Sequence, residues 1–539
     1  MAVSRRRLMQ AALLPAAVAA AQDDLALGVS KIYPGTDGKL TYVPDEQGNT
    51  IIDFSNAGYR GGGVPIPTVP VKETIWPVVG DNQANVQAAI DKVSALPLDK
   101  NGFRGAVLLR MGYYKMATPL KIQASGVVLR GEGMGDTGTI LIGTGNPRAG
   151  GGRGGGGTLV TIAGPSALAL TEASKQVVSD EYVPVGSRTI RVASARDFKV
   201  GDTVIVRRIG NQDWIKAMGM DPADNKFPWR PFNVDWDRVV TAVQGNAITV
   251  DAPITCAIEK KWGGGEVYKY TDPGRIENVG VENLRGISEF DPTIRTREYG
   301  NMDRNNYVAE EYYADEGHYW TFISFSNARH GWVRNVTQLH FGNSLANVQR
   351  SAKSVTVQDC VSKEPISQRR GARRFTFLME GQLSLVQRCT SDKGRHSFVC
   401  GNPGSCLNVF LDCVATSPFS SSEPHAQWAT GGLWDNVRAP LTARYWKDIN
   451  IGWAGANTVF WNCEGPFMVQ QPPTAQNYSF GHIGVNSVPF NIPLQDGSKP
   501  IGHLESLDKH VTPRSLYLTQ LRERLGEAAV RNIALAKQI

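Results

Sequence analysis

Short segments in which apolar and polar residues alternate recur along the second half of the chain. Five of them end at Val336, Cys360, Cys389, Cys413 and Cys463, at intervals of 24, 29, 24 and 50 residues. Alternation with a period of two is typical of a strand that buries one face. A strand that returns every 24 to 29 residues, with occasional insertions, predicts coils stacked on one another. We therefore expect an all-β fold, a parallel β-helix.

The residues next to these aligned positions support the same fold. Asn335, Asp359 and Asp412 each stand directly before one of them, and such side chains suit a bend between two strands because they tolerate left-handed backbone. The aligned cysteines are predicted to stack inward as small buried residues and not to form disulfides. Among the seven cysteines, only Cys400 and Cys406 lie close in one loop, where an oxidising compartment would allow a disulfide.

Other elements are predicted at the two ends and in two insertions. Apolar residues recur at helical spacing from Val86 to Val93, directly after N-cap candidates at 81–83, which predicts an amphipathic helix that caps the open end of the solenoid. Short alternating segments around a Trp-rich loop predict a small β subdomain at about 182–256. Residues 288–320 are expected to form a lip beside a groove, and a C-terminal helix is expected from Leu516 onward.

The N-terminus has the pattern of an export signal. Arg5, Arg6 and Arg7 precede an apolar run that ends in alanines at 19–21; this resembles a twin-arginine signal, with a general secretion signal as the alternative. The run is too short for a permanent membrane anchor. We therefore predict a signal peptide over 1–21 and a periplasmic or secreted protein with no membrane partner after its removal.

Composition changes the picture only slightly. The 539 residues are 41% hydrophobic and 20% charged, which fits one long soluble β-helix domain over 22–500 and a helical segment over 501–539 better than several domains. The formal net charge of +7 falls to +4 when the signal with its three arginines is removed. That is a mild indication of an anionic partner. Oligomeric state is left open.

Three segments near the start resemble a known superfamily. Asp81 to Ile90, the Gly-Tyr-Tyr at Gly112 and the Leu-Arg-Gly-Glu-Gly at Leu129 are similar to the opening of the pectate-lyase-like superfamily, over about 60 residues that the coil period extends to about 465. The resemblance implies a right-handed parallel β-helix that acts on polysaccharides. Because the superfamily includes polysaccharide lyases, glycoside hydrolases, epimerases and phage tailspike binding proteins, the fold does not decide the function.

Residues suited to chemistry gather in loops between 364 and 436. Stacked coils bring equivalent loops side by side, so residues about 25 apart in the sequence are expected to face one groove. The candidates form three clusters: Arg374 with Glu380; Lys393, Arg395 and His396; and Glu423, His425, Trp428, Trp434 and Asp435.

Each cluster has a predicted role. His396, whose pKa the neighbouring Lys393 and Arg395 would lower, is a candidate base, and His425 is a candidate acid or second base. Arg374 is predicted to bind substrate by its charge, and Trp428 and Trp434 by stacking on sugar rings. Glu423 is predicted either to orient a histidine or to bind sugar hydroxyls. Glu380, Asp435 and, from an earlier coil, His340 are further candidates for substrate binding. The simpler alternatives are a solvated basic loop and structural histidines.

Together these residues predict a polysaccharide lyase that cleaves an acidic, uronate-containing polysaccharide by β-elimination. Arginine would neutralise the sugar carboxylate while histidine removes the neighbouring proton. The alternatives are a glycoside hydrolase with a carboxyl pair drawn from Glu380, Asp392, Glu423 and Asp435, an epimerase, and a non-catalytic carbohydrate-binding β-helix.

No cofactor or nucleic-acid partner is predicted. The Gly-rich stretch from 143 to 157 lacks the Gly-Lys-Ser/Thr ending of a phosphate-binding loop. No metal ligands are assigned. Calcium stays open, because some relatives of this fold neutralise the uronate with it, although no calcium-binding loop motif is visible.

The export prediction can be tested directly. If the twin-arginine route recognises the signal, replacing Arg5 and Arg6 by lysine should leave the precursor in the cytoplasm. Cell fractionation and the size of the product on a gel would show this. Normal export of the double variant would remove the twin-arginine assignment.

Overall fold

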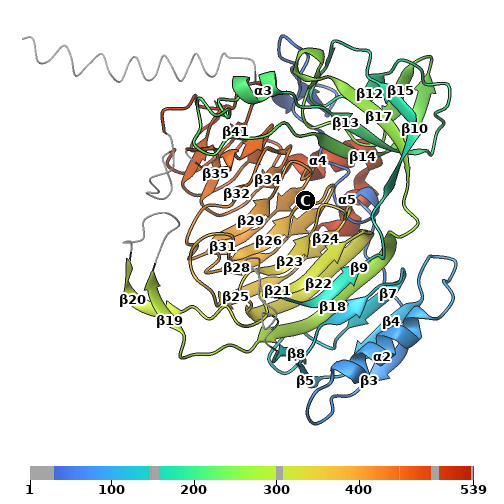
Figure 1. Cartoon of the computed structure of the whole chain (residues 1–539), viewed down its shortest axis with the longest axis vertical. Coiled ribbons are helices and arrows are strands. Elements are labelled where there is room, and N and C mark those ends of the chain that lie inside the picture. The colour runs from blue at the N-terminus through green and yellow to red at the C-terminus, as the bar shows by residue number, and fades with distance from the viewer. Residues whose placement is uncertain are drawn as a thin grey trace, which may run out of the picture.

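Stacked parallel strands make up most of the molecule. The computed structural model describes residues 30–145, 147, 157–298, 307–447, 449–486, 497–535 and 538, so the predicted signal peptide lies outside the described residues. Strands from successive turns of the chain pair in parallel and form one long β-helix (Figure 1). The predicted fold class is thereby confirmed.

The strands of the β-helix fall into three files. The first contains β4 (Gly105–Leu109), β7 (Val127–Arg130), β18 (Ile276–Ser288), β22 (Ala328–His340), β24 (Thr356–Gln358), β27 (Leu385–Gln387), β30 (Val409–Leu411), β34 (Leu433–Asp435), β39 (Val459–Trp461), β41 (Tyr478–Phe480) and β42 (His503–Glu505). The second contains β5 (Gly112–Met116), β8 (Thr139–Gly143), the later halves of β18 and β22, β25 (Val361–Pro365), β28 (Thr390–Asp392) and β31 (Val414–Thr416).

The third file is a seven-stranded sheet, and it carries the residues of interest. Its strands are β6 (Leu120–Ile122), β9 (Thr158–Ala163), β21 (Thr321–Ser326), β23 (Ser344–Val348), β26 (Phe375–Met379), β29 (His396–Cys400) and β32 (Glu423–Pro424). All neighbouring pairs in it are parallel.

Left-handed residues make the bend between the first and second files. Asn335, Asp359, Asp412 and Asn462 have φ angles of 52°, 55°, 52° and 49°, as their side chains predict, since asparagine and aspartate tolerate this conformation best. Arg388 takes the same conformation in its coil, at 52°. Its guanidinium is held there by Asp359, with Nε 2.7 Å from Oδ1.

The interior of the coils contains the predicted ladder of cysteines. Cys360, Cys389, Cys413 and Cys463 are all buried within one apolar cluster of the solenoid. All seven cysteines are buried and free, including the loop pair Cys400 and Cys406. They therefore pack as small apolar side chains.

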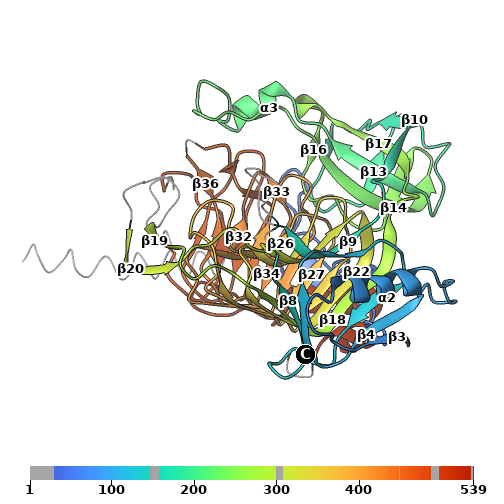
Figure 2. The ribbon, with the colours of Figure 1, turned by 60° about the horizontal axis from the view of Figure 1, so that its bottom comes forward.

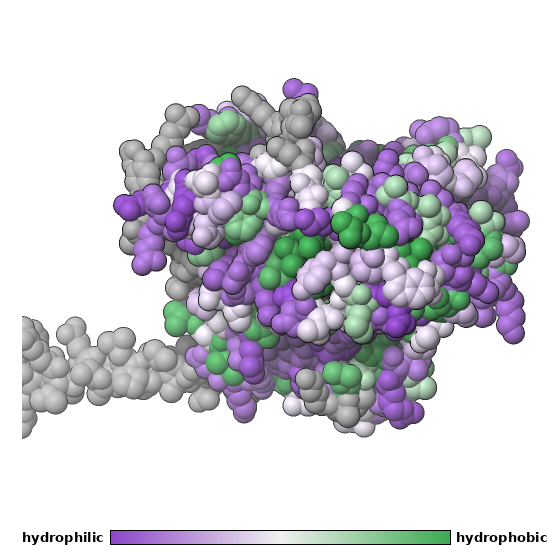
Figure 3. Space-filling view, turned by 90° about the horizontal axis from the view of Figure 1, so that it is seen from below, coloured by the Kyte–Doolittle hydropathy of each residue, from purple (hydrophilic) through white to green (hydrophobic). Residues whose placement is uncertain are grey.

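The helix α2 (Gln83–Ser94) covers the N-terminal end of the coils, as its apolar spacing predicts. Val86, Ala89, Ile90 and Val93 are buried on its inner face, which joins the core of the first coils. Beside it the rim of the first coil is in contact with solvent: hydrophobic residues stand among hydrophilic ones on this end of the molecule (Figure 3), and Trp76 is 62% exposed. The helix therefore shields the apolar interior of the first coils from solvent but does not cover their edge.

An inserted sheet leaves the solenoid between β9 and β18. Its six antiparallel strands are β10 (Ala169–Val177), β17 (Gly265–Thr271), β13 (Thr203–Arg208), β14 (Val234–Gln244), β15 (Ala247–Val250) and β12 (Thr189–Arg191), in this spatial order. It also carries β11 (Tyr182–Val183), β16 (Ile258–Glu259), α3 (Gln212–Ala217) and the short turn η2 (Lys260–Trp262). The sheet extends beyond the expected 182–256 on both sides and stands against one flank of the coils (Figure 2).

A buried ion cluster fixes this insertion to the solenoid. Asp237 of β14 accepts bonds from Lys353 of the solenoid, with Nζ 2.5 Å from Oδ1, and from Arg275, with Nη1 2.7 Å from Oδ2. The hydroxyl of Tyr270 donates to the same carboxylate at 2.6 Å. Burial alone would raise the pKa of Asp237, but Lys353 and Arg275 outweigh it and hold the pKa well below its usual range. The carboxylate is therefore charged and matched by buried cations.

The remaining elements are two C-terminal helices and a set of short strands and turns. Helices α4 (Leu516–Leu525) and α5 (Glu527–Ile533) pack against the first file of strands. The shorter elements are β1 (Ile32–Pro34), β2 (Leu40–Tyr42), η1 (Tyr59–Gly61), β3 (Val71–Ile75), β19 (Arg295–Glu298), β20 (Tyr307–Tyr313), β33 (Ala429–Thr430), β35 (Leu441–Ala443), β36 (Tyr445–Trp446), β37 (Gly452–Trp453), β38 (Gly455–Ala456) and β40 (Phe467–Val469). None of the helices in the described part of the chain combines the length and apolarity needed to span a membrane.

The cysteine ladder makes a stability prediction. Cys413→Ala should lower the free energy of unfolding by about 1 to 2 kcal/mol, because it leaves a small cavity in the fully packed core. Thr416→Ala, at an exposed position of the same coil, serves as the control and should change it by less than about 0.5 kcal/mol. Urea unfolding followed by circular dichroism measures both. A disulfide between Cys389 and Cys413 in the purified protein would contradict the ladder.

Candidate functional site

The register of the third file places a set of side chains on the outer face of its sheet. Phe375 pairs with His396, and Leu378 with Val399 on the next strand; Val399 in turn pairs with Glu423. Because parallel strands in register stack equivalent positions, Glu423 continues the line of Leu378 and Val399. These apolar neighbours form a small cluster with Phe375, separate from the solenoid core.

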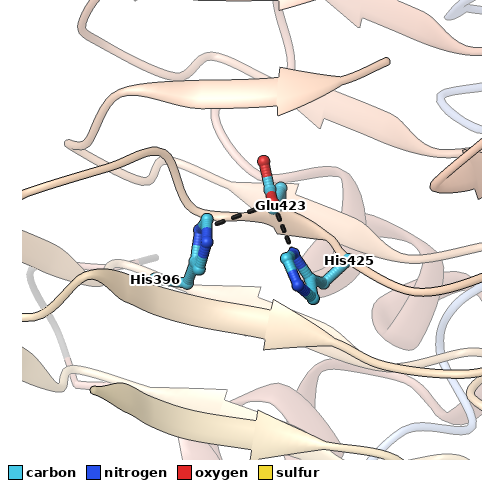
Figure 4. A group of neighbouring side chains, drawn as sticks. All are labelled: His396, Glu423 and His425. Carbon is cyan, nitrogen blue, oxygen red and sulfur yellow. Dashed lines mark hydrogen bonds and ion pairs between the residues drawn. The ribbon is translucent and has the colours of Figure 1, made fainter. Parts of the chain in front are cut away.

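Glu423 lies between two histidines (Figure 4). His425 comes two residues later and so projects to the same side of the chain; its Nδ1 donates to Oε1 of Glu423 at 2.6 Å. Nδ1 of His396 lies 3.4 Å from the same oxygen and donates to the backbone carbonyl of Ser421 at 2.6 Å. The rings of His396 and His425 are 4.7 Å apart, centroid to centroid.

The other oxygen of Glu423 is fully engaged. Oε2 accepts hydrogen bonds from the hydroxyls of Ser421 at 2.8 Å and Thr442 at 2.6 Å, and from Nη2 of Arg444 at 2.8 Å. Burial by itself would raise the pKa of Glu423, but the charge of Arg444 and the two histidines hold it well below its usual range. Glu423 is therefore a buried, ionised carboxylate with every oxygen satisfied.

Both histidines are neutral at neutral pH. Burial lowers the pKa of His396 well below its ordinary value, and that of His425 as well, although the bond to Glu423 opposes the shift in His425. The nearby positive charge of Arg395 lowers both further. Since Nδ1 of His425 carries the proton that bonds Glu423, its Nε2 presents a free lone pair.

His425 forms part of the wall of a pocket. The pocket has a volume of about 390 Å³ and is lined by Asn343, Arg350, Ala372, Phe375, Leu378, Glu380, Val399, Gly401, Asn402, Pro403, His425, Ala426 and Gln427. Burial raises the pKa of Glu380, whose Oε1 accepts a hydrogen bond from Nδ2 of Asn402 at 3.2 Å. The pocket therefore combines a neutral imidazole, a carboxyl group that holds its proton to higher pH than usual, and a guanidinium.

A larger pocket lies elsewhere. It measures about 640 Å³ and is formed by residues 45–49, 217–219, 453–457 and 471–478 with their neighbours. Among the described residues that line it there is no histidine and only one carboxylate, Asp45. Because its described lining lacks an imidazole held by a carboxylate, the smaller pocket is the candidate site.

The cluster is a poor fit to calcium, the metal that the sequence leaves open. His396, Glu423 and His425 offer ligand atoms that all lie within 4.8 Å of one another. Oε2 of Glu423, however, already accepts three donors, and the charges of Arg395 and Arg444 act on the same histidines. Calcium prefers several oxygen ligands, which this group does not supply.

Both predicted stacking tryptophans lie elsewhere. Trp428 and Trp434 are fully buried, so the prediction that they stack on sugar rings is wrong. Trp428 packs against Trp214 of the inserted sheet, with ring centroids 5.2 Å apart, and Trp434 packs against Phe410 at 5.0 Å inside the coils. Their burial follows from the insertion and from strand register, which the local sequence does not show.

Asp435 also belongs to another part of the molecule. Its Oδ2 accepts bonds from the hydroxyl of Ser515 at 2.7 Å and from the backbone N–H of Tyr517 at 2.9 Å, at the start of α4. Burial raises the pKa of Asp435 to about 7. The predicted sugar contact is wrong, because this side chain holds the C-terminal helix.

The two predicted arginines, Arg374 and Arg395, are bonded within the protein. Arg374 is buried, and its Nη2 donates to the carbonyl of Ser367 at 2.5 Å. Burial lowers the pKa of Arg374 to about 9. Arg395 is buried too, and it donates to the carbonyl of Gly371. Arg374 is therefore not placed to meet a substrate, whereas Arg395 acts on the histidines through its charge.

Two further candidates lie outside the pocket. Lys393 is exposed at the bend after β28 and is not part of the pocket wall. His340 lies several coils before His425, at the end of β22, with its Nε2 3.6 Å from Oε2 of Glu364 and its ring beside that of Phe290. Neither residue lies in the pocket with His425, so the predictions that Lys393 and His340 belong to the site are wrong.

Arg350 and Asn402 are among the polar residues of the pocket that were not predicted. They share a position with predicted ones: Arg350 follows β23, Glu380 follows β26, Asn402 follows β29 and His425 follows β32, each one or two residues beyond its strand. A coil-by-coil alignment of these strand ends would have found them. Residues 299–306 of the expected lip at 288–320 lie outside the described residues; in its described part, Glu316 pairs with Arg373.

Comparison with known proteins gives only distant likeness. Neither a protein-family model nor a curated protein sequence matches the chain. Among solved structures, the Gp54 tailspike of Acinetobacter baumannii bacteriophage AP22, in complex with capsular saccharide, is 10% identical with a TM-score of 0.43, over 76% of this chain and 57% of that one. The tailspike of E. coli bacteriophage HK620 in complex with pentasaccharide is 9% identical with a TM-score of 0.39, over 85% and 62%.

An enzyme is among the same structures. DFA-IIIase from Arthrobacter chlorophenolicus A6 is 11% identical with a TM-score of 0.35, over 79% of this chain and 76% of that one. This chain spans less than two thirds of the length of the two tailspikes. Similarity at this level decides neither fold nor function, and both rest on the geometry above.

The position of Asp435 makes a prediction about stability and pH. Its pKa in the folded state, about 7, lies above the ordinary value of 3.8, so the folded protein holds the proton more tightly than the unfolded chain. Its contribution to stability is full below about pH 4 and is lost as the pH rises toward 7. The free energy of unfolding of the wild type, measured against Asp435→Asn, should therefore fall over this range, by at most about 1.4 kcal/mol for each pH unit. A difference that stays constant from pH 4 to pH 7 would contradict the assignment.

Proposed function

We propose that this protein is a polysaccharide lyase that cleaves an acidic, uronate-containing polysaccharide by β-elimination in the pocket beside His425. The observation that carries the proposal is the neutral imidazole of His425, held by a buried, ionised Glu423 at the wall of a pocket that also contains Glu380 and Arg350. We further propose that it acts outside the cytoplasm, as the expected export signal implies.

His425 is the base of the proposed reaction. Glu423 fixes the tautomer by accepting the proton on Nδ1, so Nε2 is the atom that can remove a proton from the substrate. The same carboxylate stabilises the imidazolium that forms. His396 is bonded to Ser421 and fully buried, so its role is to position Glu423 and not to touch the substrate.

The elimination balances with the groups present. Nε2 of His425 removes the proton from the sugar carbon beside the carboxylate, and the electron pair of that bond forms a carbon-carbon double bond. The glycosidic bond on the adjacent carbon breaks, and Glu380, whose raised pKa favours its protonated form, gives its proton to the leaving oxygen. Solvent then returns a proton to Glu380 and takes one from His425.

The pocket suits elimination better than hydrolysis. A glycoside hydrolase needs two carboxyl groups on opposite sides of the bond, but among the described residues that line the pocket Glu380 is the only carboxylic acid. Glu423 is buried, and both of its oxygens are engaged. A surface that only bound saccharide would have no use for a neutral histidine positioned by an ionised glutamate.

Substitution of the base should nearly abolish turnover. His425→Ala is expected to reduce kcat at least about 100-fold, the usual range for loss of positioned acid-base catalysis, with circular dichroism and the melting temperature largely retained. His503→Ala is the matched control, because His503 also contacts a glutamate, with Nε2 2.5 Å from Oε1 of Glu505, but lies outside the pocket. Equal activity of the two variants would reject His425 as the base.

Product analysis tests the class of reaction. A panel of acidic polysaccharides is incubated with the enzyme while the ultraviolet absorbance of an unsaturated uronate is recorded. Elimination predicts one such absorbing end for each bond cleaved. Incorporation of one ¹⁸O atom from labelled water at each cleavage, without the absorbance, would mean hydrolysis instead.

A further inference from the structure

One cation of the pocket has no bonded partner among the residues that the structure describes. Arg350 lies two residues beyond β23, is exposed, and lines the pocket together with Glu380 and His425. Its guanidinium makes no hydrogen bond or ion pair with any of the described residues. By contrast, the guanidinium groups of Arg374 and Arg444 are buried and bonded to Ser367 and Glu423.

The surroundings keep this guanidinium free. Glu380 also lines the pocket. Burial raises the pKa of Glu380 and outweighs the charge of Arg350, which acts to lower it. Oε1 of Glu380 accepts a hydrogen bond from Asn402. No ion pair joins Arg350 to Glu380 among the described side chains. The planar donor fork of Arg350 is therefore available to a ligand in the pocket.

The chemistry of that ligand follows from the fork. A guanidinium binds a carboxylate through two parallel N–H···O bonds, which a hydroxyl group cannot accept in the same way. Around His425 the negative charge of Glu423 is already offset by Arg444. The positive charge of Arg350 is thus the one in the pocket without a counterion among the described residues, so an anionic ligand group would match it.

We propose that Arg350 binds the carboxylate of a uronate residue in the pocket and so selects anionic over neutral sugars. This inference rests on the proposed function, since it names the group that holds the substrate beside His425. In the proposed elimination the same contact stabilises the charge that builds up on the carboxylate when the neighbouring proton leaves. Arg350 takes no part in proton transfer.

Substitution of Arg350 should act mainly on binding. On the polysaccharide that gives the highest rate in the screen, Arg350→Gln should lower kcat/KM by about 10- to 100-fold, the loss expected for a charge-assisted bidentate contact. Arg350→Lys should recover part of it, because it restores charge without the fork. Arg196→Gln is the matched control: it removes the same charge from a site on the inserted sheet where the side chain is 84% exposed, and should change kcat/KM less than twofold.

A binding experiment separates this inference from the proposed function. Isothermal titration with galacturonate, glucuronate and mannuronate oligosaccharides, at low and high salt, requires no turnover. If no polysaccharide yields an unsaturated product but Arg350→Gln still abolishes uronate binding, the lyase assignment fails and the role of Arg350 stands. If the wild type and Arg350→Gln bind all three probes equally, and kcat/KM is unchanged, the role of Arg350 is overturned.

Discussion

In-register stacking of parallel strands is the constraint on which the rest of this molecule depends. Each coil pairs its backbone with the coils before and after it, so a side chain at one strand position acquires neighbours at the equivalent positions of adjacent coils. The line of Leu378, Val399 and Glu423 arises in this way. So does the set of residues just beyond the strand ends that forms the pocket. The site therefore consists of equivalent positions on successive coils, each occupied by a different residue.

The buried charge of Glu423 organises the chemistry of that site. A carboxylate without solvent is tolerated only when cations and donors surround it, and Arg444, Ser421 and Thr442 meet this need on one oxygen. The second oxygen is then free to orient His425. The arrangement separates two tasks, since the groups that stabilise the charge stay inside the protein and only the imidazole meets the pocket.

Features that depend on local spacing could be predicted from the sequence. The bends at Asn335 and Asp359, the cysteine ladder, the capping helix and the pair Glu423 and His425 all follow from residues a few positions apart or from one regular period. The burial of a side chain by a segment that is distant in the sequence could not be predicted. Trp428 looks like an exposed aromatic beside a histidine, yet the inserted sheet, more than 150 residues earlier in the chain, buries it.

The ion cluster around Asp237 changes how the solenoid can come apart. In a solenoid each coil contacts only its neighbours, so coils at an end can detach one after another. Here the insertion leaves the chain after β9, yet it grips Lys353 and packs against Trp428 several coils further on. These contacts couple early and late coils, so that they should unfold together. The pocket, which lies on coils within that span, should then be lost only together with the coils on either side of it.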